Sequence, residues 1–230
     1  MSTVTVAPSM LCTDYRHVEE DIRIFEASPA IEMLHIDVMD GHYVPNLGLG
    51  PSFVAALRAM TEMPIDAHLM CSEPQRLVRS FIDAGATRIS VHVEADPHLD
   101  RALNLVKSCG ATPGVAINPS TPLVSLEYAL EVAEYVLLMC VNPGFPGQTL
   151  VPYTIDKIAA LAEMVKTYNH PIEIMVDGNV TYERIPPMVR AGATILVSGT
   201  GCVFRKDRSV SEAIRALEAV FREDIPAATA

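Results

Sequence analysis

Short apolar segments alternate with longer segments of helical periodicity along almost the whole of this 230-residue chain. Runs of β-branched and other apolar residues predict eight strands, at 4–10, 33–38, 65–70, 87–93, 113–118, 135–141, 172–176 and 194–198. Their nearly continuous hydrophobicity is typical of parallel strands that are covered on both faces. Between them, apolar residues recur every three or four positions, as over 74–84 and 151–166, which indicates amphipathic helices. This alternation predicts an α/β fold with a parallel sheet and about eight helices.

Two nearly identical junctions, Ala84-Gly85-Ala86-Thr87 and Ala191-Gly192-Ala193-Thr194, support this pattern. Each places a glycine just after a predicted helix and before a predicted strand, where a left-handed backbone conformation commonly ends a helix. An open doubly wound sheet would need a glycine-rich fingerprint after its first strand, and Ala7-Pro8-Ser9-Met10 contains none. We therefore predict a single closed (β/α)8 barrel, the TIM-barrel fold.

Length and charge limit what such a barrel can do. Barrels of this kind run to roughly 200–250 residues as one unit, so we expect 1–230 to form one domain, with a flexible C-terminal tail from about 224. The chain has 17 Lys and Arg against 28 Asp and Glu, a formal net charge of -11. Because an acidic surface repels a phosphate backbone, we expect no nucleic-acid partner. Backbone N–H groups can still bind a small phosphorylated ligand.

We expect a cytoplasmic protein with no membrane partner. The cysteines are odd in number, scattered and without a CxxC pair, which indicates reduced thiols. They are Cys12, Cys71, Cys109, Cys140 and Cys202. The N-terminus shows no signal-peptide pattern, and no apolar run approaches the ~18 residues of a membrane span.

Polar residues gather where the predicted strands end, which is where this fold carries its catalytic groups. His35 and Asp37 are two residues apart on one strand, so both side chains point to the same face, toward the barrel interior. A buried His beside a buried Asp is costly unless the two are paired or bind a metal. His68 and Asp177, also at strand ends, complete a His2Asp2 set. Such a set suits Zn²⁺, and also Fe²⁺, Mn²⁺ or Co²⁺.

Each of these residues also has a structural interpretation. A single histidine at a strand end is more often a hydrogen-bonded core residue, and Asp before Gly is usually turn chemistry. The convergence of four such residues favours a site. The remaining histidines lack this convergence, and we expect them to be surface or packing residues; they are His17, His42, His92, His98 and His170.

Three glycine turns follow consecutive predicted strands and form a separate candidate anion site. The segment 142–148 (Asn-Pro-Gly-Phe-Pro-Gly-Gln) follows the sixth strand, Gly178-Asn179 the seventh and Gly199-Thr200-Gly201 the eighth. Glycines allow backbone N–H groups to close around an anion, and this fold frequently holds phosphate after strands seven and eight.

With these motifs, the chain resembles the ribulose-phosphate 3-epimerase family over nearly its whole length. The most specific stretch is His35-Ile36-Asp37-Val38-Met39-Asp40-Gly41-His42-Tyr43-Val44-Pro45-Asn46. Further matches are Ala7-Pro8-Ser9, Asp66-Ala67-His68-Leu69-Met70, Asn118-Pro119-Ser120-Thr121-Pro122, Leu137-Leu138-Met139, Val141-Asn142-Pro143-Gly144-Phe145 and Val176-Asp177-Gly178.

The resemblance implies a barrel of the ribulose-phosphate-binding type that inverts C3 of a ketose phosphate through a metal-stabilised enediolate. It implies that Asp37 and Asp177 are the acid/base pair and that, with His35 and His68, they hold one divalent metal per chain, for which we favour Zn²⁺. It implies sugar contacts from Ser9 and His68. The phosphate end would be held by Gly144, Phe145, Pro146, Gly147, Gly178, Asn179, Gly199 and Thr200. Methionines would line the site or only fill the core; they are Met39, Met70 and Met139. The resemblance also suggests a homo-oligomer, a dimer or hexamer.

Four departures from the common pattern leave the sugar open. Pro146 has no N–H, Asn179 replaces a second glycine, and the segments 9–14 and 199–204 resemble the allulose-6-phosphate 3-epimerase branch. We favour D-ribulose 5-phosphate, interconverted with D-xylulose 5-phosphate, over D-allulose 6-phosphate, interconverted with D-fructose 6-phosphate. Less favoured alternatives are a metal-free lyase, which would place Lys at a strand end, and an inactive binding protein.

Overall fold

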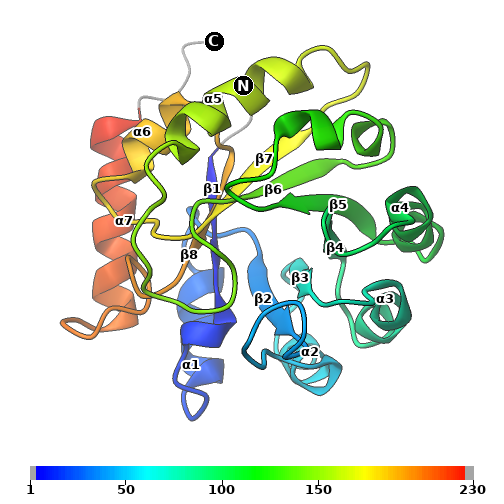
Figure 1. Ribbon diagram of the computed structural model, residues 1–230. Coiled ribbons are helices and arrows are strands. Elements are labelled where there is room, and N and C mark those ends of the chain that lie inside the picture. Colours follow the sequence, from blue (N-terminus) through cyan, green and yellow to red (C-terminus); the bar gives the residue numbers. More distant parts are fainter. Residues whose placement is uncertain (1–3, 226–230) are drawn as a thin grey trace.

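The computed structural model describes residues 4–225, which form eight parallel β-strands and seven α-helices (Figure 1). All eight predicted strands are confirmed, with small shifts at their ends. They are β1 (Thr5–Pro8), β2 (Leu34–Met39), β3 (Ile65–Met70), β4 (Arg88–His92), β5 (Thr112–Ile117), β6 (Tyr135–Met139), β7 (Glu173–Asp177) and β8 (Ile195–Ser198).

The strands are arranged in the order β1-β8-β7-β6-β5-β4-β3-β2, with every adjacent pair parallel. The ring closes between β1 and β2 through isolated bridges that join Val6 to Ile31 and Ser9 to His35. This closure confirms the predicted (β/α)8 barrel over an open sheet. Because all strands run in one direction, their C-terminal ends meet at one mouth of the barrel.

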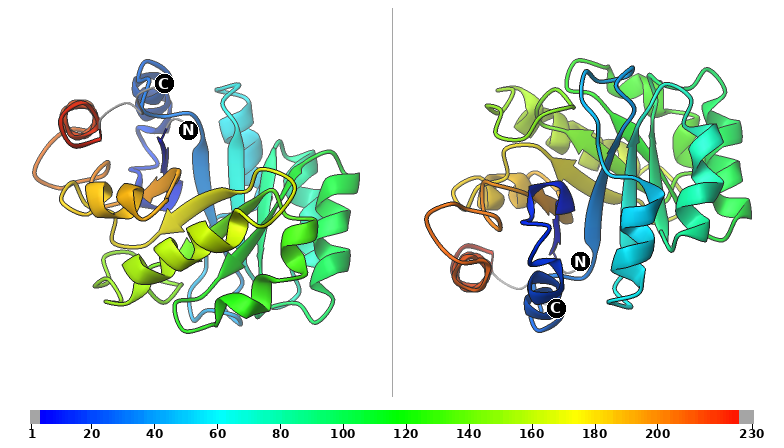
Figure 2. Two further views of the ribbon diagram at one scale, coloured as in Figure 1. Left: turned by 90° about the horizontal axis from the view of Figure 1, so that it is seen from above. Right: turned by 90° about the horizontal axis from the view of Figure 1, so that it is seen from below.

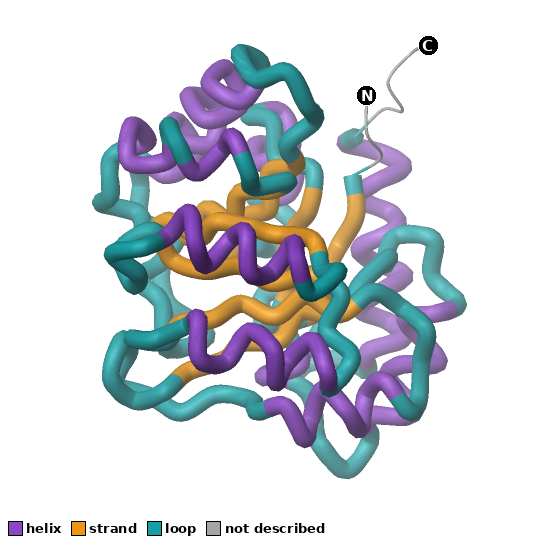
Figure 3. The backbone as a smooth tube through the Cα atoms, turned by 90° about the vertical axis from the view of Figure 1, so that its right-hand side faces the viewer, coloured by secondary structure: helices purple, strands orange, loops and turns teal. Residues whose placement is uncertain are grey.

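Helices surround the strands on the outside (Figure 3). They are α1 (Val18–Glu26), α2 (Pro51–Arg58), α3 (Gln75–Asp83), α4 (Leu99–Ser108), α5 (Thr154–Val165), α6 (Ile185–Arg190) and α7 (Val210–Asp224). Helices α1 and α7 lie next to each other (Figure 2). The predicted helices at 74–84 and 151–166 are present as α3 and α5. No helix in the described range is long and apolar enough to cross a membrane.

The connection from β5 to β6 differs from the others, because two 3-10 helices (Leu123–Leu126 and Ala129–Glu131) replace an α-helix there. Prolines at 119 and 122 remove backbone donors at the start of this segment. The ammonium group of Lys157, on α5, donates instead to the carbonyl oxygens of Asn118, Pro119 and Thr121. This cation satisfies backbone carbonyls that a helix would have paired.

The two repeated junctions contain left-handed glycines, as predicted. Gly85 has a φ of +112° and Gly192 a φ of +114°. A Cβ atom at Gly85 would lie 2.7 Å from Cγ of Arg58, and one at Gly192 would lie 2.5 Å from Cβ of Ala162. Glycine is therefore required at both positions by conformation and by space.

Two layers of apolar side chains hold the barrel together. The outer layer packs strands against helices and includes Leu34, Ile36 and Val38, as expected for the residues that alternate with His35 and Asp37. The inner layer fills the barrel below its mouth with Ala7, Met33, Ala116, Tyr135, Leu137, Met139, Met175, Ile195 and Val197. Helix α7 ends at Asp224, and most of the predicted flexible tail, residues 226–230, lies outside the described residues.

Candidate active site

Strand ends bring four predicted side chains together at the mouth of the barrel. His35 and Asp37 come from β2, His68 from β3 and Asp177 from the end of β7. One ligand atom from each lies within 4.8 Å of the corresponding atoms of the others. We call these four residues the donor cluster. His35 and Asp37 are two residues apart on β2, so both side chains point into the barrel. Asp177 reaches the same point from β7, which is not a neighbour of β2 in the ring.

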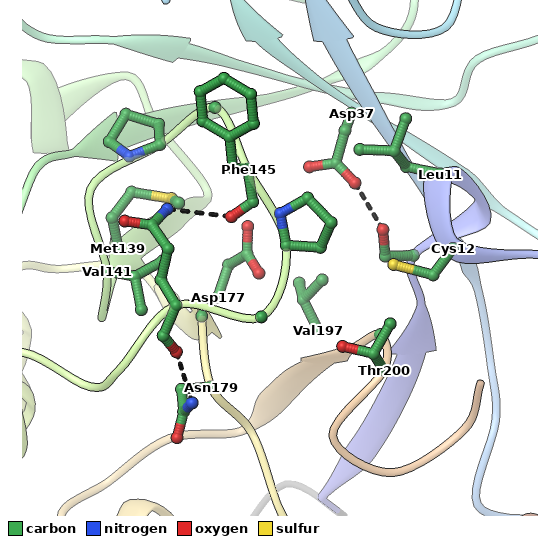
Figure 4. A pocket seen from close by; sticks show the side chains of 18 of the residues that line it. Leu11, Cys12, Asp37, Met139, Val141, Phe145, Asp177, Asn179, Val197 and Thr200 are labelled. Atoms are coloured by element: carbon green, nitrogen blue, oxygen red, sulfur yellow. Dashed lines mark hydrogen bonds between the residues drawn. The ribbon is translucent and has the colours of Figure 1, made fainter. Parts of the chain in front are cut away.

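The two oxygens of Asp37 face different neighbours. Oδ1 lies 3.6 Å from Nε2 of His35 and 4.0 Å from Nδ1 of His68. Oδ2 accepts a hydrogen bond of 2.5 Å from the hydroxyl of Ser9. One oxygen therefore lies nearer the imidazoles, while the other is held by Ser9. The carboxylate of Asp37 borders the cavity (Figure 4).

The donor cluster fits a divalent metal on two grounds. His35 Nε2 and His68 Nδ1 are buried, lie on the Asp37 side of their rings and have no hydrogen-bond partner within residues 4–225. Buried nitrogens without partners are costly, and their placement beside two carboxylates is an arrangement that could hold a cation. Imidazole nitrogen and carboxylate oxygen are also the donors that Zn²⁺, Fe²⁺, Mn²⁺ and Co²⁺ accept.

The charges of this cluster act strongly on one another. Burial, followed by the negative charge of Asp37, raises the pKa of Asp177 to about 7. Burial lowers the pKa of His35, but the carboxylates of Asp37 and Asp66 outweigh it and hold that pKa well above its usual value. Burial, together with the neighbouring imidazoles, holds the pKa of His68 well below its usual value. A carboxyl group with a strongly perturbed pKa beside a cavity, as found for Asp177, is typical of a functional site.

A second layer of polar side chains supports His35 from below. Nδ1 of His35 lies 2.7 Å from Oδ2 of Asp66, and the hydroxyl of Tyr135 donates to Oδ1 of Asp66 over 2.5 Å. Arg88 lies over the ring of Tyr135, 4.2 Å from its centroid. Gly114 makes room for this ring, since a Cβ there would lie 2.1 Å from Cζ of Tyr135. Sequence reasoning missed Asp66, although its position two residues before His68 puts both on one face of β3.

His68 has a different support. His92, expected to be a surface or packing residue, is fully buried, and its Nε2 lies 2.8 Å from Nε2 of His68. Its Nδ1 lies 3.0 Å from Oε2 of Glu94. The sequence does not reveal this contact, because His92 meets His68 through the pairing of β3 with β4. The other four histidines lie outside this cluster, as expected.

A cavity of about 700 Å³, including its open mouth, lies beside the donor cluster. Asp37 and Asp177 project into it from different strands (Figure 4). Nine of the residues predicted to bind substrate line it: Ser9, Gly144, Phe145, Pro146, Gly147, Gly178, Asn179, Gly199 and Thr200. So do Met39, Met70 and Met139, whereas His68 is fully buried and lies outside this lining.

One end of this cavity is formed by loop backbone, and we call it the glycine-lined end: residues 142–148, 178–179 and 199–201. Gly144, Gly147 and Gly178 have φ values of +120°, +80° and +110°. Asn179 has a φ of +54° and is the one non-glycine residue with positive φ in the described part of the chain. Its side chain donates to the carbonyl of Gln148 over 2.5 Å and accepts from Arg184. Asparagine tolerates this conformation better than most residues, which explains how it replaces a glycine here.

A barrel with ionisable side chains converging at the C-terminal ends of its strands is the arrangement of a TIM-barrel enzyme. The sequence model of the Ribulose-phosphate 3 epimerase family matches residues 5–204 of this chain. The chain therefore belongs to the ribulose-phosphate 3-epimerase family and is an isomerase, as its motifs predict.

Curated relatives are similar to this chain over most of their length. The ribulose-phosphate 3-epimerase of Bacillus subtilis is 42% identical over 206 residues, covering 89% of this chain and 94% of the relative. The chloroplastic ribulose-5-phosphate-3-epimerase of Arabidopsis thaliana is 41% identical, covering 100% of this chain and 80% of the relative. That of Aquifex aeolicus is 43% identical, covering 88% and 90%.

Solved structures of lower identity share the fold. KGPDC from Streptococcus mutans superimposes with a TM-score of 0.72 at 11% identity, covering 98% of this chain and 100% of that one. A 3-hexulose-6-phosphate synthase superimposes with a TM-score of 0.66 at 18% identity, covering 96% and 99%. These similarities support the barrel architecture alone.

Proposed function

We propose that this protein is a metal-dependent 3-epimerase that interconverts D-ribulose 5-phosphate and D-xylulose 5-phosphate. The observation that carries this proposal is that two carboxylates, from β2 and β7, line one cavity and lie within 4.8 Å of two buried imidazole nitrogens that have no hydrogen-bond partner in the described residues. The names of the curated relatives support the pentulose phosphate as substrate.

Inversion at C3 requires two proton-transfer groups. A proton α to the C2 carbonyl is removed from one face of the sugar, and a proton is returned to the opposite face of the planar intermediate. Asp37 and Asp177 reach the cavity from separate strands, β2 and β7, so each carboxylate would serve one face. The raised pKa of Asp177 suits a group that alternates between acid and base near neutral pH.

His35, Asp37, His68 and Asp177 would hold one divalent ion, and we favour Zn²⁺ for this donor set. When bound, such an ion acts as a Lewis acid that stabilises negative charge developing on the substrate oxygens. Ser9 holds the Asp37 carboxylate through Oδ2 and so orients it at the cavity. A supported carboxylate loses less conformational freedom during proton transfer.

The glycine-lined end is the proposed site for the phosphate group. Positive φ values at Gly144, Gly147 and Gly178 turn the backbone sharply around the cavity, which suits backbone N–H donors to an anion. Gln148 fixes this loop by donating to the carbonyls of Asn142 and Phe145, 2.6 Å and 2.9 Å away. Phosphate binding here would align C3 with the two carboxylates.

A second candidate substrate is D-allulose 6-phosphate, which would be inverted at the same carbon. Cys12, Thr200 and Gly201, where the chain departs from the pentulose pattern, all line the cavity. The lyase alternative is less favoured, because no lysine is among the described residues that line the cavity. The assembly as a dimer or hexamer, the single domain and the cytoplasmic location stay predictions.

The test is kcat/KM for D-ribulose 5-phosphate and D-allulose 6-phosphate on protein of measured metal content. We expect about one divalent ion per chain, loss of activity with a chelator, and recovery with Zn²⁺ or Co²⁺. A higher kcat/KM for allulose 6-phosphate would reassign the substrate and retain the reaction. Metal-free protein with full, chelator-resistant activity would remove the metal from the mechanism.

A further inference from the structure

A buried chain of hydrogen bonds runs from the donor cluster to the rim of the barrel. His68 Nε2 lies 2.8 Å from His92 Nε2, and His92 Nδ1 lies 3.0 Å from Glu94 Oε2. Both imidazoles are fully buried, whereas the Glu94 side chain is 22% exposed. At the inner end, Nδ1 of His68 is directed at Asp37 Oδ1, 4.0 Å away.

Two facing imidazole nitrogens share one proton, so one ring must donate and the other accept. A carboxylate can only accept, so Glu94 requires the proton of His92 to be on Nδ1. A positive charge on His92 would be buried against another imidazole, which favours the neutral ring. Neutral His92 then offers a lone pair at Nε2, and His68 must carry its proton on Nε2. The lone pair of His68 is therefore on Nδ1, which faces the donor cluster.

We propose that Glu94 is a positioning residue that, through His92, sets the tautomer of His68 so that Nδ1 is free to bind a cation. The role of this tautomer in metal binding rests on the proposed function, but the order of protons does not. Glu94 touches neither the cavity lining nor the donor cluster, and it acts across two hydrogen bonds.

The hydrogen bonds of the second oxygen of Glu94 allow the positions of the protons on His92 and His68 to be tested. Oε1 accepts from the backbone N–H of Asn118 over 2.9 Å and from the hydroxyl of Thr121 over 2.5 Å. Burial raises the pKa of Glu94, but hydrogen bonds from His92, Thr121 and Asn118 outweigh it and lower the pKa to about 2. In Glu94→Gln, the amide oxygen should occupy the position of Oε1, because a backbone N–H can only donate. The amide NH2 would then face His92 Nδ1 and require a lone pair there.

Glu94→Gln should therefore invert the protons along the chain. His92 would carry its proton on Nε2 and donate to His68 Nε2, which places the proton of His68 on Nδ1. The measurement is two-bond ¹H–¹⁵N correlation of ¹⁵N-histidine protein after metal removal, at neutral pH. We expect the Nε2–H tautomer for His68 in the wild type and the Nδ1–H tautomer in Glu94→Gln. Glu163→Gln is the matched control, because within residues 4–225 Glu163 pairs only with Lys166, on the exposed face of α5.

The second readout is the affinity for Zn²⁺, measured by competition with a chromophoric chelator. We expect Glu94→Gln to weaken Zn²⁺ binding about 10- to 100-fold, as for other outer hydrogen-bond partners of ligating histidines, and Glu163→Gln to leave it unchanged. The Nδ1–H tautomer of His68 in the wild type would overturn the proposal, even if the variant does not fold. So would an unchanged tautomer, or unchanged Zn²⁺ affinity, in folded Glu94→Gln.

These outcomes separate this proposal from the proposed function. Wild-type protein with the expected tautomers and tight Zn²⁺ binding, but no turnover of either sugar phosphate, would count against the epimerase and support the role of Glu94. Conversely, an active epimerase whose His68 carries its proton on Nδ1 before metal binding would remove that role and leave the reaction in place.

Discussion

The donor cluster and the glycine-lined end of the cavity belong to one site, but they are built from different parts of the chain. The donor cluster consists of side chains on strands, backed by buried partners such as Asp66 and His92. The glycine-lined end consists of loop backbone, held by side chains that bind carbonyl oxygens, such as Gln148 and Asn179. Strand register fixes the first, whereas the second is fixed by turns and by the side chains that tie those turns to one another.

Because the two parts are built differently, substitutions in them should affect different kinetic constants. A side chain of the donor cluster takes part in proton transfer, so its loss should lower kcat. The glycine-lined end would hold a group away from the reacting carbon, so a loosened loop should chiefly raise KM. Three predictions, two at the donor cluster and one at the glycine-lined end, probe the two parts of the site, beginning with the largest effect.

Asp37→Asn and Asp177→Asn should each lower kcat by about 10³-fold, because an amide cannot accept the C3 proton at neutral pH. In Asp177→Asn, Asp37 should still exchange the C3 proton of one epimer with solvent, since that step needs only one base. The measurements are turnover and deuterium uptake at C3 in D2O by NMR.

The matched control is Asp156→Asn, on the exposed first turn of α5 and outside the cavity lining, which should keep the wild-type kcat. Wild-type turnover in either variant of the donor cluster would exclude the two-base assignment. Deuterium uptake into neither epimer by Asp177→Asn would show that Asp37 does not act alone as a base.

The same division explains what was predictable from the sequence. The strands and the donor cluster were predictable, because apolar runs identify strands and a period of two fixes the face of His35 and Asp37. His92 was not, because its contact with His68 depends on how β4 pairs with β3. Asp66 does carry a signal in the sequence, because its spacing of two residues from His68 puts both side chains on one face of β3. The conformation of Asn179 depends on partners from two other segments, Gln148 and Arg184, which a local pattern does not contain.

The second prediction concerns the stability of metal-free protein. Burial and the charge of Asp37 raise the pKa of Asp177 from 3.8 to about 7 in the folded state. A raised carboxyl pKa favours folding below pH 3.8, and this contribution is lost as pH rises through about 7. Relative to Asp177→Asn, the wild type should therefore become less stable as pH rises from about 4 to 7.5, by roughly 3–4 kcal/mol, since each unit of pKa difference corresponds to about 1.4 kcal/mol.

Urea unfolding of both proteins across this pH range, after metal removal, gives the difference directly. Added Zn²⁺ should reverse it, because a cation replaces the proton between the carboxylates. If the difference in unfolding free energy between wild type and Asp177→Asn stays constant with pH, the surroundings do not destabilise the charged form of Asp177.

The smallest effect is expected at the glycine-lined end, for Asn179→Gly. Glycine adopts the positive φ of residue 179 without strain, so the turn should remain while the bonds to Gln148 and Arg184 are lost. We expect KM to rise about 3- to 10-fold with kcat within about two-fold, because the loosened loop weakens ground-state and transition-state binding alike. Asn179→Ala tests the backbone as well, since alanine adds a cost of roughly 1 kcal/mol in the left-handed conformation. Steady-state kinetics on both variants measures the split. A fall in kcat at constant KM would instead make Asn179 part of the catalytic machinery and break the division between the two ends.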